Sequence, residues 1–273
     1  MLTSILIAAA VIVLAMIFGP SLPGGEMLGG AFYQTMAIIV AVIITAIGFS
    51  PIISLYKANA ATSRGQHKKA IPLYKKAGMS KNVSSELAIY SGYMLLKEGK
   101  TSDAEKVFDK VSKRKLSEKQ QNSLNTNLAL LKWKQGDIEK GIELLSTVWE
   151  KEKTAAAGGS LGALLLLKGD VSAAEKLCSE AYGAYEHDKT IMCNMGEVYL
   201  KLGKLDEAEE IFEKMIDLDP DAPAPYYNYA LLLIKRGRLS DAEEMLDRAL
   251  RYRFTALTPI TRKDVEKALE QCV

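Results

Sequence analysis

The stretch GEVYLKLGKLDEAEEIFEKMIDLDP, residues 196–220, decides the fold of this chain. Gly203 divides it into two halves that are rich in Leu, Lys and Glu, which are good helix formers. The stretch YNYALLLIKRGRLSDAEEMLDRAL, residues 227–250, repeats the pattern 34 residues later, with Gly237 in the place of Gly203. Because glycine readily adopts the left-handed conformation that ends a helix, each stretch predicts a helix, a tight turn and a second helix.

The same pattern extends toward the N-terminus. Turn glycines recur with gaps of 37, 33, 34 and 34 residues, and a further step of 34 residues back from Gly99 reaches Gly65. The six predicted turn glycines are Gly65, Gly99, Gly136, Gly169, Gly203 and Gly237. Small residues let the two helices of a pair approach closely, and no pair buries its own apolar face, so the pairs must stack on one another.

A period of 34 residues is the signature of the tetratricopeptide repeat, and the chain resembles this family over residues 51–254. The resemblance is carried most clearly by Gly196, Tyr199, Gly203, Ala208, Phe212 and Pro220. It implies an all-α fold, a right-handed α-solenoid of six helix pairs. Residues 255–273 are then a capping helix, which starts either at Thr258 with Pro259 or at Thr261 with Asp264.

Residues 1–56 have a different composition, because they hold no Lys or Arg and a single acid, Glu26. Two apolar runs, at about residues 2–18 and 31–55, flank a loop rich in Gly and Pro at residues 19–30. The first run is about 25 Å long as a helix, just enough to cross the bilayer core. Since no positive segment and no A-x-A site marks a cleaved signal peptide, we predict a two-helix transmembrane hairpin before the solenoid.

Basic residues begin directly after the second apolar run. Seven of them fall between Lys57 and Lys81, whereas the loop at residues 19–30 has none. The positive-inside rule therefore predicts that both termini and the repeats lie in the cytosol, with the loop outside; the layout suggests a bacterial plasma membrane. The membrane-proximal basic residues are Lys57, Arg64, Lys68, Lys69, Lys75 and Lys76. They predict either contact with membrane lipid, through its anionic headgroups, or a solvated helix face that only sets the topology.

The second span and the first repeat helix are predicted to be one continuous helix. Gly65 is the first strong turn signal after Ala31, although Gly48 and Pro51 are places where the helix can bend.

Composition and motifs argue against several other classes of protein. A net charge of +2 does not suggest a nucleic-acid partner. The three cysteines, Cys178, Cys193 and Cys272, form no C-x-x-C pair, which disfavours a disulfide framework or a zinc site. The two histidines are isolated, and no phosphate-binding loop or nucleophile motif is present. We therefore predict no catalytic residue, no metal, no cofactor and no small-molecule substrate.

In the tetratricopeptide family the first helices of the pairs line a concave groove, and the resemblance implies the same positions here. The predicted partner-binding strip consists of Ile89, Tyr93, Leu96, Leu130, Trp133, Leu166, Glu197, Leu200, Tyr227, Leu231 and Ile234. Its apolar and aromatic character suits an amphipathic helix or an extended apolar segment of a partner protein. The other interpretation is that these side chains are core between neighbouring helices. Lys97, Lys134, Lys201 and Lys235 form at most a rim.

The sequence thus predicts a membrane-anchored scaffold or adaptor that presents a repeat groove to the cytosol. The alternative is an accessory subunit of an integral membrane complex for secretion, envelope biogenesis or transport, which it would contact through the hairpin.

Overall fold

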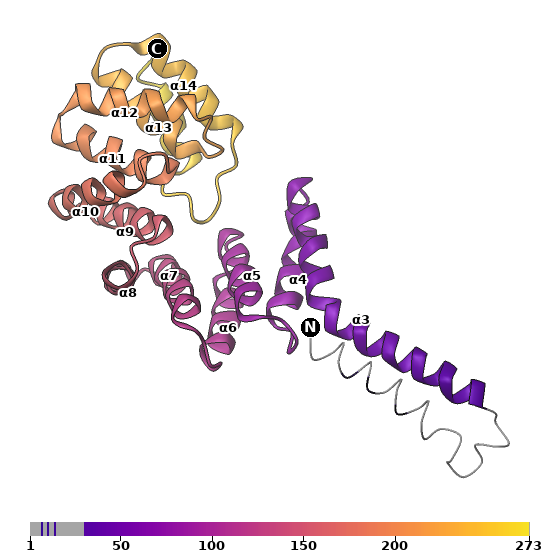
Figure 1. Ribbon diagram of the computed structural model, residues 1–273. Helices are drawn as coiled ribbons and strands as arrows, with labels where there is room; N and C mark the ends of the chain where they lie inside the picture. Colours follow the sequence, from indigo (N-terminus) through magenta and orange to yellow (C-terminus); the bar gives the residue numbers. More distant parts are fainter. Residues whose placement is uncertain (1–6, 8–9, 11–13, 15–29, 273) are drawn as a thin grey trace. The chain divides into compact units, whose positions relative to one another are not determined.

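The computed structural model describes residues 7, 10, 14 and 30–272, and the side chains of the last range from residue 35 onward. This part of the chain holds thirteen α-helices, α3 to α15, and no strand (Figure 1). The all-α class predicted from the sequence is therefore confirmed. The first predicted span and the loop after it lie almost entirely outside the described residues, so the hairpin stays a prediction.

The chain divides into two compact units, Met1–Gly92 and Tyr93–Val273, and the boundary falls inside α5 (Ser85–Lys97). The first unit contains α3 (Gly30–Ser63) and α4 (His67–Gly78). The second unit contains α6 (Thr101–Ser112), α7 (Glu118–Lys134), α8 (Ile138–Lys151), α9 (Ala155–Lys168), α10 (Val171–Ala184), α11 (Lys189–Leu202), α12 (Leu205–Asp217), α13 (Pro223–Lys235), α14 (Leu239–Arg251) and α15 (Arg262–Leu269).

Helix α3 joins the predicted second span to the first repeat without a break. It is a single helix of 34 residues with Pro51 in its interior, so the predicted continuous helix is confirmed. Figure 1 shows that α3 changes direction along its length, and a proline inside a helix is a known cause of such a bend. By length and composition α3 is able to cross a membrane.

Tight turns end the first helix of each pair at the six glycines that the repeat pattern singles out. Their φ angles are 70°, 71°, 93°, 85°, 74° and 73° in chain order, all in the left-handed region. A side chain is strained in that region, which is why the repeat places glycine there.

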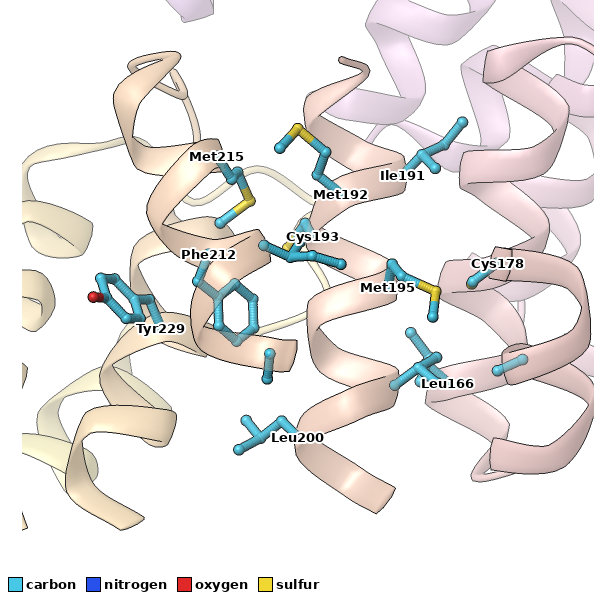
Figure 2. Close-up of a cluster of buried hydrophobic side chains, with 14 of the residues drawn as sticks. Leu166, Cys178, Ile191, Met192, Cys193, Met195, Leu200, Phe212, Met215 and Tyr229 are labelled. Atoms are coloured by element: carbon cyan, nitrogen blue, oxygen red, sulfur yellow. The ribbon is translucent and has the colours of Figure 1, made fainter. Parts of the chain in front are cut away.

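Both within a pair and between neighbouring pairs, small residues on one helix receive a large side chain of the next helix. A Cβ atom on Gly196 of α11 would collide with the ring of Phe212 on α12, and one on Gly158 of α9 would lie 2.7 Å from the Trp149 ring on α8. The glycines therefore let neighbouring helices pack closely, and Phe212 lies fully buried in the resulting cluster (Figure 2).

The C-terminal end differs in detail from the predicted cap. Helix α15 begins after Thr261, whose hydroxyl accepts a hydrogen bond from the Asp264 N–H while Asp264 receives one from the Thr261 N–H. This capping box selects the second of the two predicted starts. Val265 and Ala268 are buried, and α15 packs against α14, so the helix covers the last pair. Residues 252–261, between α14 and α15, are irregular.

Candidate functional site: the face of the first helices

The candidate site lies on the first helices of successive pairs in the second unit. Helix α9 contacts α7 and α11, and α11 contacts α13, so the first helices from α7 to α13 are direct neighbours. Because each helix sits at the same place in its repeat, residues at equivalent positions fall on one continuous face. The predicted strip from Tyr93 to Ile234 lies on these helices, with Ile89 on the part of α5 that belongs to the first unit.

Burial separates the predicted strip into two groups. Ile89, Leu96, Leu166 and Leu200 are buried, with at most 5% of each residue exposed, and Figure 2 shows the last two in the buried cluster. The half-buried group consists of Tyr93, Leu130, Trp133, Glu197, Tyr227, Leu231 and Ile234. The buried four act as core between neighbouring helices. The half-buried seven keep a surface that another molecule can contact, and their role as a binding surface stays a prediction.

Trp133 on α7 and the three residues of α13 supply large apolar side chains to this group. Trp133, Tyr227, Leu231 and Ile234 all pack on the core with part of each side chain left exposed. On α9, which lies between α7 and α11, Leu166 is buried. The large side chains therefore form two patches, one on α7 and one on α13.

Glu197 on α11 is the acidic residue of the strip, and its carboxylate is held in place. It accepts a hydrogen bond of 3.1 Å from the Asn228 side-chain amide on α13 and pairs with Lys201 at 3.4 Å. Burial, and after it the charge of Glu197, raises the pKa of the Cys193 thiol to about 12. Burial also raises the pKa of Tyr227, with smaller contributions from the charges of Asp264 and Glu197. The carboxylate adds a polar point beside the apolar patch of α13.

Two buried asparagines connect neighbouring first helices. Asn194 on α11 donates a 2.7 Å hydrogen bond to the carbonyl of Gly159 on α9, and Asn228 on α13 donates to Glu197 on α11. Each is 6% exposed, so the hydrogen bonds satisfy amide groups that would otherwise be costly to bury. Sequence reasoning gave these residues no such role, although their separation of 34 residues was a signal that both occupy one repeat position.

The lysines predicted as a rim make local contacts. The Lys134 ammonium lies 4.4 Å from the centre of the Trp133 ring, and Lys235 donates to the Leu200 carbonyl at 3.4 Å. A cation placed over an indole is attracted by the ring face. These two lysines therefore border the two apolar patches.

The six membrane-proximal basic residues lie in the first unit, and all six are exposed. Helix α4 buries Ala70, Tyr74, Ala77 and Gly78, which leaves its lysines on the outside. The sequence has no acid between Glu26 and Glu86, so this surface is uniformly positive.

Comparison with known proteins identifies the repeats. Tetratricopeptide repeat family models match residues 126–189, 165–216 and 203–256. Among solved structures, the chain is similar to a tetratricopeptide repeat protein from Parabacteroides merdae, with a TM-score of 0.63 at 12% identity over 97% of this chain and 98% of the other. It is also similar to a thermophilic protein of the same kind from Thermus thermophilus, with a TM-score of 0.55 at 20% identity over 69% of this chain and 98% of the other.

A third similar structure is the APC/C hetero-tetramer Cut9–Hcn1, with a TM-score of 0.63 at 14% identity over 88% of this chain and 46% of the matched chain. At these identities the structures establish the fold alone. The solenoid fold and the family matches agree with the spacing of the turn glycines. Residues 126–256 are therefore tetratricopeptide repeats, and repeats of this family serve as scaffolds for protein–protein interaction.

Proposed function

We propose that this protein is a membrane-anchored scaffold whose repeats hold a partner protein at the cytosolic face of a bacterial plasma membrane. The observation that carries the proposal is α3, because one helix supplies both the apolar segment and the first helix of the first repeat. Its N-terminal part exposes large apolar side chains, among them Ile38 at 50%, Val42 at 61% and Ile47 at 57%. Such a surface is unfavourable in water and favourable in lipid.

The C-terminal part of α3 has the opposite character, since it packs on a folded repeat. Ala58 is fully buried, and Asn59 accepts hydrogen bonds from the Tyr74 hydroxyl of α4 at 2.7 Å and from the Tyr90 hydroxyl of α5 at 2.9 Å. These contacts fix α4 and the start of α5 to α3 without a flexible linker. An anchor built in this way limits the freedom of the first repeat relative to the membrane.

The direction of the anchor follows from charge. All six membrane-proximal basic residues come after the apolar part of α3, and this supports a cytosolic position for the first repeat. The same residues are suited to contact anionic lipid headgroups, at about 1 kcal/mol for each residue near the surface.

The partner that best fits the first-helix face is an amphipathic helix or an extended apolar segment. The two patches, Trp133 on α7 and Tyr227, Leu231 and Ile234 on α13, offer aromatic and aliphatic contact area. Glu197 and Lys134 add one negative and one positive charge beside them. Aromatic side chains commonly supply the largest share of binding energy at such surfaces.

The test is site-specific photo-crosslinking in native membranes, with the photoreactive residue at Trp133 or at Tyr227. We expect one partner to be captured from both positions, and we expect Trp133→Ala and Tyr227→Ala to lose that partner with helicity unchanged. Tyr182→Ala is the matched control, because Tyr182 is a half-buried tyrosine of the second helix α10 on the same core.

The proposal would be wrong if both alanine variants kept the partner while remaining folded. Capture from Ile43 in the apolar part of α3, with none from Trp133 or Tyr227, would support instead the accessory-subunit alternative.

A further inference from the structure

Residues 252–261 return to a distant part of the second unit. The Arg253 guanidinium makes two hydrogen bonds with the Glu98 carboxylate, at 2.8 Å and 2.6 Å, across 155 residues of sequence. The Ala256 N–H donates to the Lys97 carbonyl at 3.1 Å. The Ala256 methyl lies 3.6 Å from the position of a Cβ on Gly99. The segment therefore binds the turn between α5 and α6, as side chain, backbone and methyl contact it together.

Interactions at the start, middle and end of residues 252–261 hold the segment in the conformation that reaches this turn. Tyr252 stacks on Tyr226 with the ring centres 5.3 Å apart and the planes within 9° of parallel. Thr258 then accepts a 2.9 Å hydrogen bond from the Thr255 N–H, which closes a compact turn. The Arg262 guanidinium of α15 lies 5.4 Å from the centre of the Phe254 ring. In Figure 1 this segment is the yellow loop that extends away from the last helices.

The contact between residues 252–261 and the α5–α6 turn differs in kind from the contacts between neighbouring helix pairs. Neighbouring pairs bury extended apolar faces, whereas this one rests on an ion pair, a backbone hydrogen bond and a methyl contact. Only 3% of the Glu98 side chain is exposed, while 41% of Arg253 remains exposed to solvent and salt. A buried carboxylate is costly without a cation, and an exposed arginine is free to leave. This combination favours a specific closed state that opens without disturbing the helix pairs.

We propose that residues 252–261 are a latch that binds the α5–α6 turn and releases it reversibly. In a solenoid each repeat contacts only its neighbours, so its length and curvature adjust by small changes between pairs. The latch ties the end of the chain to the second helix pair, and when closed it fixes the distance between the two ends of the second unit. When open, it leaves that distance free to change. The latch requires neither a particular partner nor a membrane.

The first test is disulfide trapping in the full-length protein in detergent, with Cys272→Ser as the background. The variant Gly99→Cys/Ala256→Cys places its Cβ atoms about 3.6 Å apart, within the range of about 3.5–4.5 Å that disulfides require. Its matched control is Gly136→Cys/Ala256→Cys, because Gly136 also has a positive φ but has nothing within 4 Å of its Cβ position. We expect crosslinking in the first variant only. Equal crosslinking in both, or in neither, would overturn the latch.

The second test measures release through the crosslinking rate. We expect Arg253→Gln, added to the Gly99→Cys/Ala256→Cys variant, to slow crosslinking about fivefold or more, and 1 M NaCl to act in the same direction. Arg251→Gln is the control, because Arg251 is a nearby exposed arginine at the end of α14. If neither Arg253→Gln nor salt changed the rate, the segment would be a permanent part of the core and the proposal would be wrong. Circular dichroism of each variant verifies that the helices remain folded.

Discussion

The first helix pair, α3 with α4, and the fifth, α11 with α12, have similar buried residues but different exposed residues. Inside each pair an aromatic residue, Tyr74 or Phe212, is fully buried, as is the alanine four positions before it, Ala70 or Ala208. Outside, α4 carries four exposed lysines in a segment without acids. Helix α12 instead carries charges that are paired, with Lys214 bound to Glu210 at 2.6 Å and Glu209 bound to Arg238 of the next pair at 2.5 Å.

This difference teaches that one set of residues specifies the repeat fold and another set suits each pair to its environment. The inner residues specify a helix pair in both places. The outer residues differ because the fifth pair faces water and its neighbours, whereas the first pair follows the apolar part of α3. Like charges that lie close together on a protein surface repel one another, and an anionic partner relieves this repulsion.

The largest expected effect tests whether the buried rings of the first and fifth pairs stabilise the protein equally. We expect Phe212→Ala and Tyr74→Ala each to lower the free energy of unfolding by about 3–5 kcal/mol, since each removes a fully buried ring and leaves a cavity. Urea unfolding followed by circular dichroism measures both. A loss below about 1 kcal/mol at either site would show that the corresponding ring does not support its pair.

The loss of stability at alkaline pH tests the interior of the second unit, because this unit holds all three cysteines. Burial, and after it the charge of Glu197, raises the pKa of Cys178 and of Cys193 to about 12. The unfolded thiols lose their protons near pH 8.5. The unfolded chain thus binds fewer protons between about pH 8.5 and 12, and stability must fall as the pH rises, by up to about 1.4 kcal/mol per pH unit for each thiol.

The measurement is urea unfolding between pH 8 and 11 for the natural protein and for Cys178→Ala/Cys193→Ala. The slope against pH is the readout, since the variant also loses some stability at every pH through its smaller side chains. We expect a shallower slope in the variant. Identical slopes would mean that these thiols are not buried in the neutral form.

The smallest effect on stability concerns the outer face of the first pair. We expect Lys68→Gln/Lys69→Gln to change the free energy of unfolding by less than about 0.5 kcal/mol, as is usual for exposed side chains. The same variant should bind more weakly to vesicles that contain phosphatidylserine, with no change for neutral vesicles. Lys263→Gln/Lys267→Gln on the exposed face of α15 is the matched control. Equal vesicle binding by all three proteins would mean that the basic face is only solvated.

The helix pairs could be predicted from the sequence because the signals are local and repeated. Gly203 and Gly237 end helices by their own backbone preference, and the spacing of Ala208 and Phe212 recurs in every pair in some form. The unbroken α3 followed from the lack of a turn signal before Gly65. The start of α15 was narrowed to two places, and the Thr261–Asp264 capping box decides between them.

Other features could not be predicted because they depend on distant residues. Leu166 and Trp133 occupy comparable places in the periodic pattern, yet Leu166 is 4% exposed and Trp133 is half-buried, since neighbouring helices decide the burial of each. The pairing of Arg253 with Glu98 joins residues 155 positions apart, and neither residue stands out in its local sequence. For the bridging amides Asn194 and Asn228, the sequence shows only that the two residues are one repeat length, 34 positions, apart.

The central claim is that α3 lies in a membrane and emerges from it as a repeat helix, and a cysteine scan along α3 tests it most directly. Single cysteines from Met36 to Ser63, in a background with Cys272→Ser, are labelled with an impermeant maleimide in inverted membrane vesicles, which expose the cytosolic side. We predict protection from Met36 to about Ile53, and labelling at exposed positions such as Lys57 and Ser63. Labelling of Ile43→Cys as fast as of Lys57→Cys, or release of the protein by a carbonate wash, would contradict the account.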